Sequence, residues 1–168
     1  LLYFTAMMNI HCPNIAELAI ESRPEFVDMA ELEVLSRALS EGDTPTKLEI
    51  AIGFEAFDDR IRNEHFHKGM SLEVFEDLAS KLAQYKFQLK TYFMLKPVPG
   101  MSDEDAIEDI RMAIVYLDHI SQKYGFPINL HLNPTFVAKG TLLEQAFLEG
   151  RYTPPHLETV RQATLHAR

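Results

Sequence analysis

The chain has 168 residues, a length typical of a single domain with one hydrophobic core, and 46% of them are hydrophobic and 24% charged. Its 25 acidic and 16 basic residues give a formal net charge of −9, which repels nucleic-acid phosphates unless the basic side chains gather in one patch. Cys12 is the only cysteine, which excludes an intrachain disulfide and a four-cysteine metal cage built from this chain alone. We therefore expect a cytoplasmic protein, and no membrane partner because no run approaches the ~18 apolar residues of a membrane span.

Four β-rich runs alternate with longer helical patterns, as in successive strand–helix units of a parallel sheet. The sequence predicts strands within 16–22, 48–55, 88–100 and 127–132, and helices within 28–39, 71–85, 102–125, 141–150 and 153–165. The expected helix caps are Asp28 with Glu31, Ser71, Ser102, Thr141 with Glu144, and Thr153 followed by Pro154, with Gly42 as a stop signal. The expected buried helix faces are Leu32, Leu35 and Leu39; Leu72, Phe75, Leu78, Ala79 and Leu82; and Ile107, Ile110, Ile114 and Leu117.

The second and third strand runs are apolar almost throughout, which is typical of parallel strands covered on both faces. In such α/β folds the functional loops follow the carboxyl ends of the strands. Here those ends read "ESRPEF", "GFEAFDDR", "LKPVPG" and "HLNPTFVAKG". Glu55 closes a buried strand, and its carboxylate could accept two ligand hydroxyls at once.

These four strand ends, in this order, resemble the second half of the radical S-adenosylmethionine core, in the branch of the Elongator catalytic subunit and the archaeosine-pathway radical enzymes. The resemblance runs from about Glu21 to Pro155. "ESRPEF" is similar to that branch's E-[ST]-R-P-[DE] strand end, and "IGFEAFDDRIRNEHFHKG" to its G-x-[EQ]-S segment followed by N-[RK]-G. "YFMLKPVPG" resembles its methionine and proline–glycine strand, and "NPTFVAKGTLLEQAFLEGRYTPP" its closing segment.

The resemblance implies an α/β fold, a partial (β/α) barrel with a mainly parallel sheet of about four strands flanked by helices. Residues 1–168 would form a single domain, the C-terminal part of that barrel. The full-length parent would bind S-adenosylmethionine and a [4Fe-4S] cluster, but this chain lacks the three-cysteine loop, so we expect neither cofactor bound to it and no activity from it alone. Ala56 also stands where the family usually has Ser, which removes one hydroxyl contact.

The resemblance assigns cofactor-binding roles to residues at the strand ends. Gly53 and Glu55 belong to the G-x-[EQ]-S segment, where Glu55 would accept the ribose hydroxyls; a solvated loop acid is the alternative. Arg23, with Glu21, would suit the methionine carboxylate, or the two could pair with each other. Lys68 matches the family's basic residue before Gly69, a position where a positive φ would favour glycine; a surface lysine is the alternative.

Other polar residues have weaker functional interpretations. Asn133, just before Pro134, could hydrogen-bond substrate or cofactor, or form a turn. His65 and His67 have H-x-H spacing but no third ligand nearby, so no metal site is predicted. Structural roles are expected for His119, His131, Phe93 and Met94, and Cys12 is expected to be inert.

Two hypotheses follow, and a third is weaker. In the first, the chain is a fragment of a radical S-adenosylmethionine iron–sulfur oxidoreductase that supplies the ribose and adenine side of the cofactor cleft; its catalytic residues are unknown. Its partner would be the missing N-terminal part of the same polypeptide, with transfer RNA (tRNA) possible by family analogy and a homodimer possible through an exposed sheet edge. In the second, it is a stand-alone, cluster-free α/β module that binds a nucleoside-like ligand or a protein. The third is a metal hydrolase built on the histidines.

Overall fold

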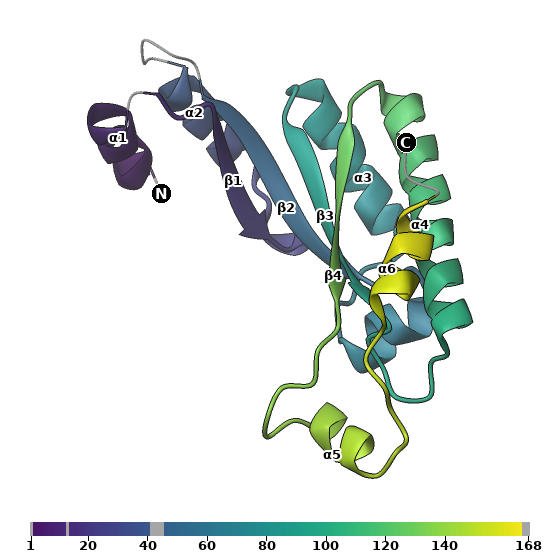
Figure 1. Ribbon diagram of the computed structural model, residues 1–168. Coiled ribbons are helices and arrows are strands. Elements are labelled where there is room, and N and C mark those ends of the chain that lie inside the picture. The colour runs from purple at the N-terminus through teal and green to yellow at the C-terminus, as the bar shows by residue number, and fades with distance from the viewer. Residues whose placement is uncertain (1, 13, 41–45, 166–168) are drawn as a thin grey trace. The chain divides into compact units, whose positions relative to one another are not determined.

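The computed structural model describes residues 2–12, 14–40 and 46–165 (Figure 1). Its elements in chain order are α1 (Leu2–His11), β1 (Glu17–Ser22), the 3-10 turn η1 (Pro24–Phe26), α2 (Met29–Leu39), β2 (Lys47–Glu55), the π-helical turn η2 (Ile61–His65), α3 (Leu72–Gln84), β3 (Gln88–Leu95), α4 (Asp103–Tyr124), β4 (Ile128–Pro134), α5 (Leu142–Leu148) and α6 (Leu157–Thr164). In the described part of the chain, no helix is both long enough and apolar enough to cross a bilayer.

Four strands form one sheet in the order β1-β2-β3-β4, so strands that follow each other in sequence are neighbours (Figure 1). β1 and β2 pair in parallel, with Glu17 opposite Lys47 and Ser22 opposite Ile52. Parallel neighbours need a crossover connection, which α2, α3 and α4 supply. The result is an open α/β sheet of four parallel strands flanked by helices, not closed into a barrel, which confirms the predicted fold class.

The described residues divide into two compact units. The first consists of residues up to Gly53 together with 72–91 and 121–129, and the second consists of 54–71, 92–120 and 130 onward. The chain of β2, β3 and β4 passes from the first unit into the second. The carboxyl ends of these three strands, where the functional loops were predicted, therefore belong to the second unit.

In the first unit, the helix caps and buried faces follow the sequence pattern closely. The Asp28 carboxylate accepts a 2.9 Å hydrogen bond from the Glu31 amide at the start of α2. The predicted stripe of α2 is confirmed by buried Leu32, Leu35 and Leu39. In α3 the prediction is right for buried Phe75, Leu78, Ala79 and Leu82 but wrong for Leu72, which is the first residue of the helix and only half-buried. α1 packs on α2, and α3 contacts η1. Gly42, the predicted stop signal, lies outside the described residues.

The first unit also contains a buried charge that the apolar reading of β2 missed. Glu49 is fully buried in β2, where its carboxylate accepts a 2.7 Å hydrogen bond from the Asn129 side chain and forms an ion pair with Lys90. β2 is buried almost throughout, as predicted, whereas β3 alternates between buried and half-buried residues. The prediction that both faces of β3 are covered is therefore wrong for the face of Gln88, Lys90, Tyr92 and Met94, which is only half-buried.

The core of the second unit begins with Phe54, whose ring stacks on Phe93 at 4.8 Å between centroids. The ring centroid of Tyr116 in α4 lies 6.4 Å from that of Phe54, so this helix packs against the ends of β2 and β3. The buried face of α4 consists of Ala106, Asp109, Ile110, Ala113, Leu117 and Ile120. The prediction was therefore right for Ile110 and Leu117 but wrong for Ile107 and Ile114. These two are half-buried and flank the buried face, whose centre includes the small residues Ala106 and Ala113.

The C-terminal segment of the second unit departs from prediction at its last helix. Thr141 caps α5 as predicted, accepting a hydrogen bond from the Glu144 amide at 3.2 Å. α6 begins at Leu157, with His156 at its N-cap, and not after Thr153. The predicted start at Pro154 fails because a residue that precedes a proline is disfavoured in the helical region, and Pro155 follows it. α6 lies beside α4, tied by a 2.6 Å hydrogen bond from Thr159 to Asp103 (Figure 1).

Candidate functional site

Glu55 ends β2 in an unusual backbone conformation. Its φ is +70°, a left-handed value that costs a residue with a side chain about 1–2 kcal/mol and that persists only where the surroundings impose it. Its side chain is 19% exposed, and its Oε1 lies 2.7 Å from the Nζ of Lys68. The structure therefore brings together two of the predicted site residues, and Gly53 lies two positions earlier in β2 on the same strand face.

Lys68 comes from the loop that follows η2, and Gly69 next to it has a φ of +61°. A Cβ at position 69 would meet no atom within 4 Å, so the backbone conformation and not the space requires glycine. The predicted positive φ is thus confirmed. The Lys68 amide donates to the Arg62 carbonyl at 3.2 Å, which returns the loop toward Glu55.

The turn after Glu55 is fixed by two buried side chains that the sequence analysis did not single out. Asp109 of α4 accepts hydrogen bonds from the amides of Phe57 and Asp58, at 3.0 and 2.7 Å. The Arg62 guanidinium, 1% exposed, donates to the carbonyls of Ala56 and Phe57, at 3.2 and 2.7 Å. The backbone amides of this turn therefore donate to the Asp109 carboxylate, and its backbone carbonyls accept from the Arg62 guanidinium.

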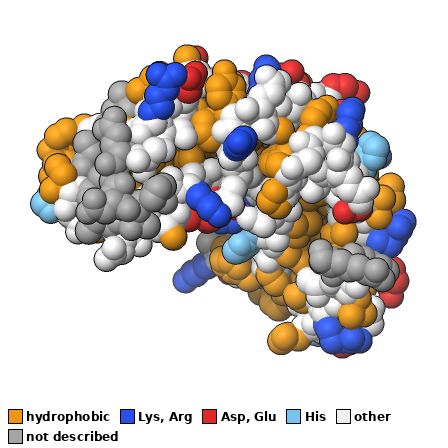
Figure 2. Space-filling model, turned by 90° about the horizontal axis from the view of Figure 1, so that it is seen from above, with side chains coloured by type: hydrophobic (Ala, Val, Ile, Leu, Met, Phe, Trp, Pro, Cys, Tyr) orange, Lys and Arg blue, Asp and Glu red, His pale blue; other side chains and the backbone are white. Residues whose placement is uncertain are grey.

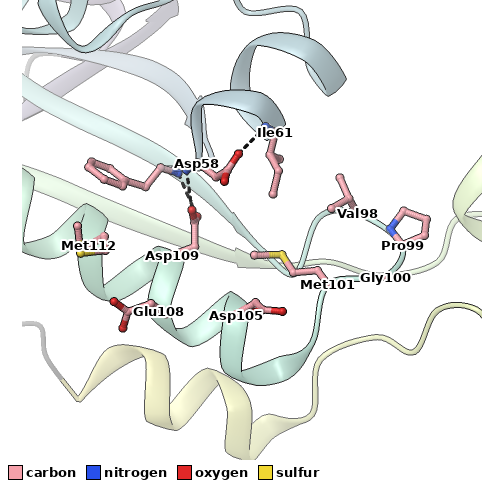
Figure 3. Close-up of a pocket in the computed structure, with 11 residues that line it drawn as sticks. Asp58, Ile61, Val98, Pro99, Gly100, Met101, Asp105, Glu108, Asp109 and Met112 are labelled. Carbon is pink, nitrogen blue, oxygen red and sulfur yellow. Dashed lines mark hydrogen bonds between the residues drawn. The ribbon is translucent and has the colours of Figure 1, made fainter.

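Asp109 also lines a hollow of about 510 Å³ within the second unit (Figure 3). Apolar groups and carboxylates share its wall, which consists of Phe57, Asp58, Ile61, Val98, Pro99, Gly100, Met101, Asp105, Glu108, Asp109 and Met112. Burial raises the pKa of Asp109 above its ordinary value, although the Phe57 and Asp58 amides oppose the shift. The size falls within the range of small-molecule sites, and no lysine or arginine lines the hollow.

A charged residue with a positive φ follows β3 directly, as one ends β2. Lys96 has a φ of +57° and forms a 2.6 Å ion pair with Asp103, and only 9% of its side chain is exposed. The Tyr152 hydroxyl donates to the Lys96 carbonyl at 2.8 Å, and the Lys96 ammonium lies 5.9 Å from the Tyr152 ring centroid. The hydrogen bonds from Lys96 and Thr159 lower the pKa of Asp103.

The other predicted cofactor-binding residues lie at the ends of β1 and β4. Glu21 and Arg23 belong to the first unit, both are exposed, and the Arg23 Nε forms a 2.7 Å ion pair with Glu25. Asn133 belongs to the second unit and is half-buried, but it lies within β4 and not in a loop, because β4 continues to Pro134. Their roles toward a cofactor stay predictions.

The histidines do not form a metal centre in the part of the chain that the structure describes. His65 and His67 are exposed, and no group of three or more His, Cys, Asp or Glu side chains among the described residues is placed to hold a metal ion. His131 packs edge-on against Tyr92, 5.1 Å between ring centroids, which fits the structural role predicted for it. Met94 is half-buried on the same strand as Tyr92.

Comparison with known proteins finds relatives over most of the chain, although no family model matches it. This chain is 31% identical over 155 residues to the protein named archaeosine synthase subunit beta of Methanosarcina acetivorans. The match covers 90% of this chain and 42% of that protein. Its counterpart of the same name in Thermococcus kodakarensis is 28% identical over 156 residues, covering 92% of this chain and 44% of that protein.

A third relative has a different name. The tRNA uridine(34) acetyltransferase of Dehalococcoides mccartyi is 30% identical over 137 residues, covering 82% of this chain and 27% of that protein. The chain spans less than half the length of these curated relatives. Over more than four-fifths of its length, it is therefore related to one segment shared by proteins named as an archaeosine synthase subunit and a tRNA acetyltransferase.

Proposed function

We propose that this chain supplies the ribose and adenine side of an S-adenosylmethionine cleft in a radical S-adenosylmethionine protein related to tRNA-modification enzymes. The observation that carries the proposal is Glu55, a half-buried carboxylate held in a left-handed conformation at the carboxyl end of a central parallel strand. Ligands of open α/β sheets bind at such strand ends. The strand-end motifs that resemble the family support the cofactor assignment, and the names of the relatives support the link to tRNA modification.

Glu55 suits a vicinal diol on chemical grounds. A carboxylate has about four lone-pair positions on two oxygens, so the Lys68 ammonium at 2.7 Å leaves acceptor capacity for two hydroxyl donors. The neighbouring charge of Lys68 also balances the carboxylate in a partly buried place. Ribose offers two adjacent hydroxyls, which matches this capacity.

The residues do not fit the iron–sulfur cluster of such proteins. Fe–S clusters are held by several cysteine thiolates, and this chain has only Cys12, which is exposed. We therefore assign no cluster ligand and no redox step to this chain. The thiolates would come from another part of the parent polypeptide.

Neither the net charge nor the face of the described residues in Figure 2 favours RNA binding by this chain. The net charge is −9, and on the face in Figure 2 the Lys and Arg side chains lie singly among acidic and apolar groups. Because RNA binding depends on several phosphate contacts from clustered basic groups, we assign tRNA contact to other parts of the parent. The role proposed for this chain is thus cofactor binding.

Calorimetric titration of the chain with adenosine and with 2′,3′-dideoxyadenosine tests the proposal. We expect adenosine to bind at least tenfold more tightly, because the dideoxy compound cannot donate to Glu55. Glu55→Gln should reduce adenosine affinity about tenfold and remove the preference for the diol. Glu64→Gln is the matched control, because Glu64 is 67% exposed and pairs only loosely, at 3.7 Å, with Arg60. Equal affinity of the wild-type chain for the two nucleosides would contradict the proposal.

A second candidate is a cluster-free module that binds a nucleoside-like ligand or a protein partner. It is favoured by the presence of a single cysteine. The reading frame upstream of the Leu1 codon distinguishes the two: three cysteines at cluster spacing there would support the radical S-adenosylmethionine parent. An upstream sequence without them would support the stand-alone module.

A further inference from the structure

The turn after Glu55 is held by hydrogen bonds with two side chains. Its first two peptide carbonyls, those of Ala56 and Phe57, accept hydrogen bonds from Arg62, and its next two amides, those of Phe57 and Asp58, donate to Asp109. The Phe57 peptide unit is therefore held at both ends. A hydrogen-bonded turn of this kind leaves the preceding residue little freedom to change its φ.

Asp109 reaches this turn from another element. It lies on α4, 51 residues after Asp58, and is 8% exposed (Figure 3). Both of its carboxylate oxygens are used, Oδ2 for Phe57 and Oδ1 for Asp58. A carboxylate that receives two backbone amides fixes their separation and direction, which a single acceptor atom would not do.

Arg62 holds the other side of the turn. Besides the two carbonyls, its Nε donates to the Met70 carbonyl at 2.8 Å and its NH2 nitrogen to Asp59 at 2.6 Å. Its guanidinium also lies 5.0 Å from the Phe54 ring centroid. Arg62 thus connects the end of β2 to the backbone just after Gly69, and so to the loop that supplies Lys68.

We propose that Asp109 and Arg62 are positioning residues that pre-organise Glu55 for its ligand without touching that ligand. The inference rests on the proposed function for the ligand itself. Glu55 alone would relax from its left-handed φ of +70°, since that conformation is unfavourable for a residue with a Cβ. The fixed Phe57 peptide prevents this relaxation, so the carboxylate is already aimed before the ligand arrives.

Asp109→Asn separates positioning from folding. The amide retains one acceptor oxygen but presents N–H groups to the second backbone amide, so one of the two bonds to the turn is lost. We expect adenosine affinity to fall about tenfold while the circular dichroism spectrum is kept. Glu108→Gln, one residue earlier in the same hollow, should change affinity less than twofold, because the Glu108 carboxylate accepts hydrogen bonds from Arg111.

A double-mutant cycle identifies the residue through which Asp109 acts. In the Glu55→Gln background, Asp109→Asn should cause little further loss of affinity, because its effect passes through Glu55. A purely structural role would give the same tenfold loss in both backgrounds. Additive losses would therefore overturn the proposal.

A measurement on the wild-type chain keeps the proposal testable if the variant fails to fold or if no nucleoside binds. The NMR shifts of the Phe57 and Asp58 amides should titrate together with the side-chain carboxyl carbon of Asp109, above the usual range of an aspartate. Asp58, Asp105 and Glu108 are the other acids near this group, and Arg62 is the nearby cation. The proposal that Asp109 holds this turn would be refuted if the two amide shifts instead followed the Asp58 carboxyl group. It would also be refuted if these amides exchanged with solvent as fast as those of an exposed loop. Absence of adenosine binding together with coupled amide titration would refute only the proposed ligand.

Discussion

At the carboxyl ends of the neighbouring strands β2 and β3, a charged residue has a positive φ, but the two residues have different roles. β2 ends with Glu55 at φ +70°, and Lys96 follows β3 directly at φ +57°; both are charged, and each forms an ion pair. The Lys96 side chain is 9% exposed, whereas those of Glu55 and Lys68 are 19% and 22% exposed. The same strained conformation therefore presents an accessible carboxylate in one case and a buried cation in the other.

The partners of the two residues explain the difference. Lys96 is held by Asp103 at the start of α4 and by Tyr152, so it connects β3 to the C-terminal segment. Glu55 pairs with Lys68, which belongs to its own strand–helix connection. The comparison suggests that the end of β3 maintains the fold and that the end of β2 serves a ligand.

The largest expected effect is on the stability of the hydrogen-bonded turn that follows Glu55. Arg62→Met should lower the free energy of unfolding by about 3–5 kcal/mol, because it leaves the buried carbonyls of Ala56 and Phe57 without their side-chain donor and removes one of two donors to the Met70 carbonyl. Urea denaturation measures the change. Arg60→Met is the matched control, since Arg60 is 81% exposed, and its loss should cost no more than about 0.5 kcal/mol. Equal losses in the two variants would show that the buried network is not formed.

Glycine at the end of β3 should cost stability. Lys96→Gly relieves the positive φ, a gain of about 1 kcal/mol, but removes a nearly buried ion pair and the contact with Tyr152. We expect a net loss of about 2 kcal/mol in urea denaturation. Adenosine affinity should stay within twofold of wild type. A tenfold loss of affinity would show that the end of β3 also contacts the ligand.

The same substitution at the end of β2 should give the opposite balance. Glu55→Gly relieves similar strain and loses only a partly exposed ion pair, so we expect its stability to lie within about 0.5 kcal/mol of wild type. Adenosine affinity should fall at least tenfold. A residue that can be removed without loss of stability but with loss of binding is placed for function. If Glu55→Gly destabilised the chain as much as Lys96→Gly, the contrast between the two strand ends would be wrong.

The difference between local and long-range contacts explains what the sequence could predict. The strand end at Glu55, the positive φ of Gly69 and the caps of α2 and α5 depend on residues a few positions apart, and the structure bears them out. Asp109 looked like one acid among several at the start of a charged helix. Its burial depends on amides 51 and 52 residues earlier in the chain, which no local pattern contains.

Arg62 and Lys96 were missed for the same reason. In the sequence, Arg62 is one of several charged residues between Asp58 and Lys68, and only the folded structure shows that its guanidinium is enclosed. Lys96 follows an apolar strand as Glu55 does, but its partner Tyr152 is 56 residues away. The error at α6 has a local cause instead, because Pro155 disfavours the helical conformation of Pro154 and so delays the start of the helix to Leu157.

The smallest expected effect is the pH dependence at the end of β3. Hydrogen bonds from Lys96 and Thr159 lower the pKa of Asp103 below 3.8, so the unfolded chain binds this proton more readily than the folded chain does. The stability that Asp103 contributes is therefore complete above that value and is lost as the pH falls through the lowered pKa. Because the carboxylate is 29% exposed, we expect only about 0.5–1 kcal/mol at pH 7. In urea denaturation, the advantage of wild type over Asp103→Asn should shrink below about pH 4. Glu104→Gln, which changes an exposed acid in the same first turn of α4, serves as the control. An advantage of wild type over Asp103→Asn that persisted unchanged to pH 2 would place the stabilising role of this strand end elsewhere.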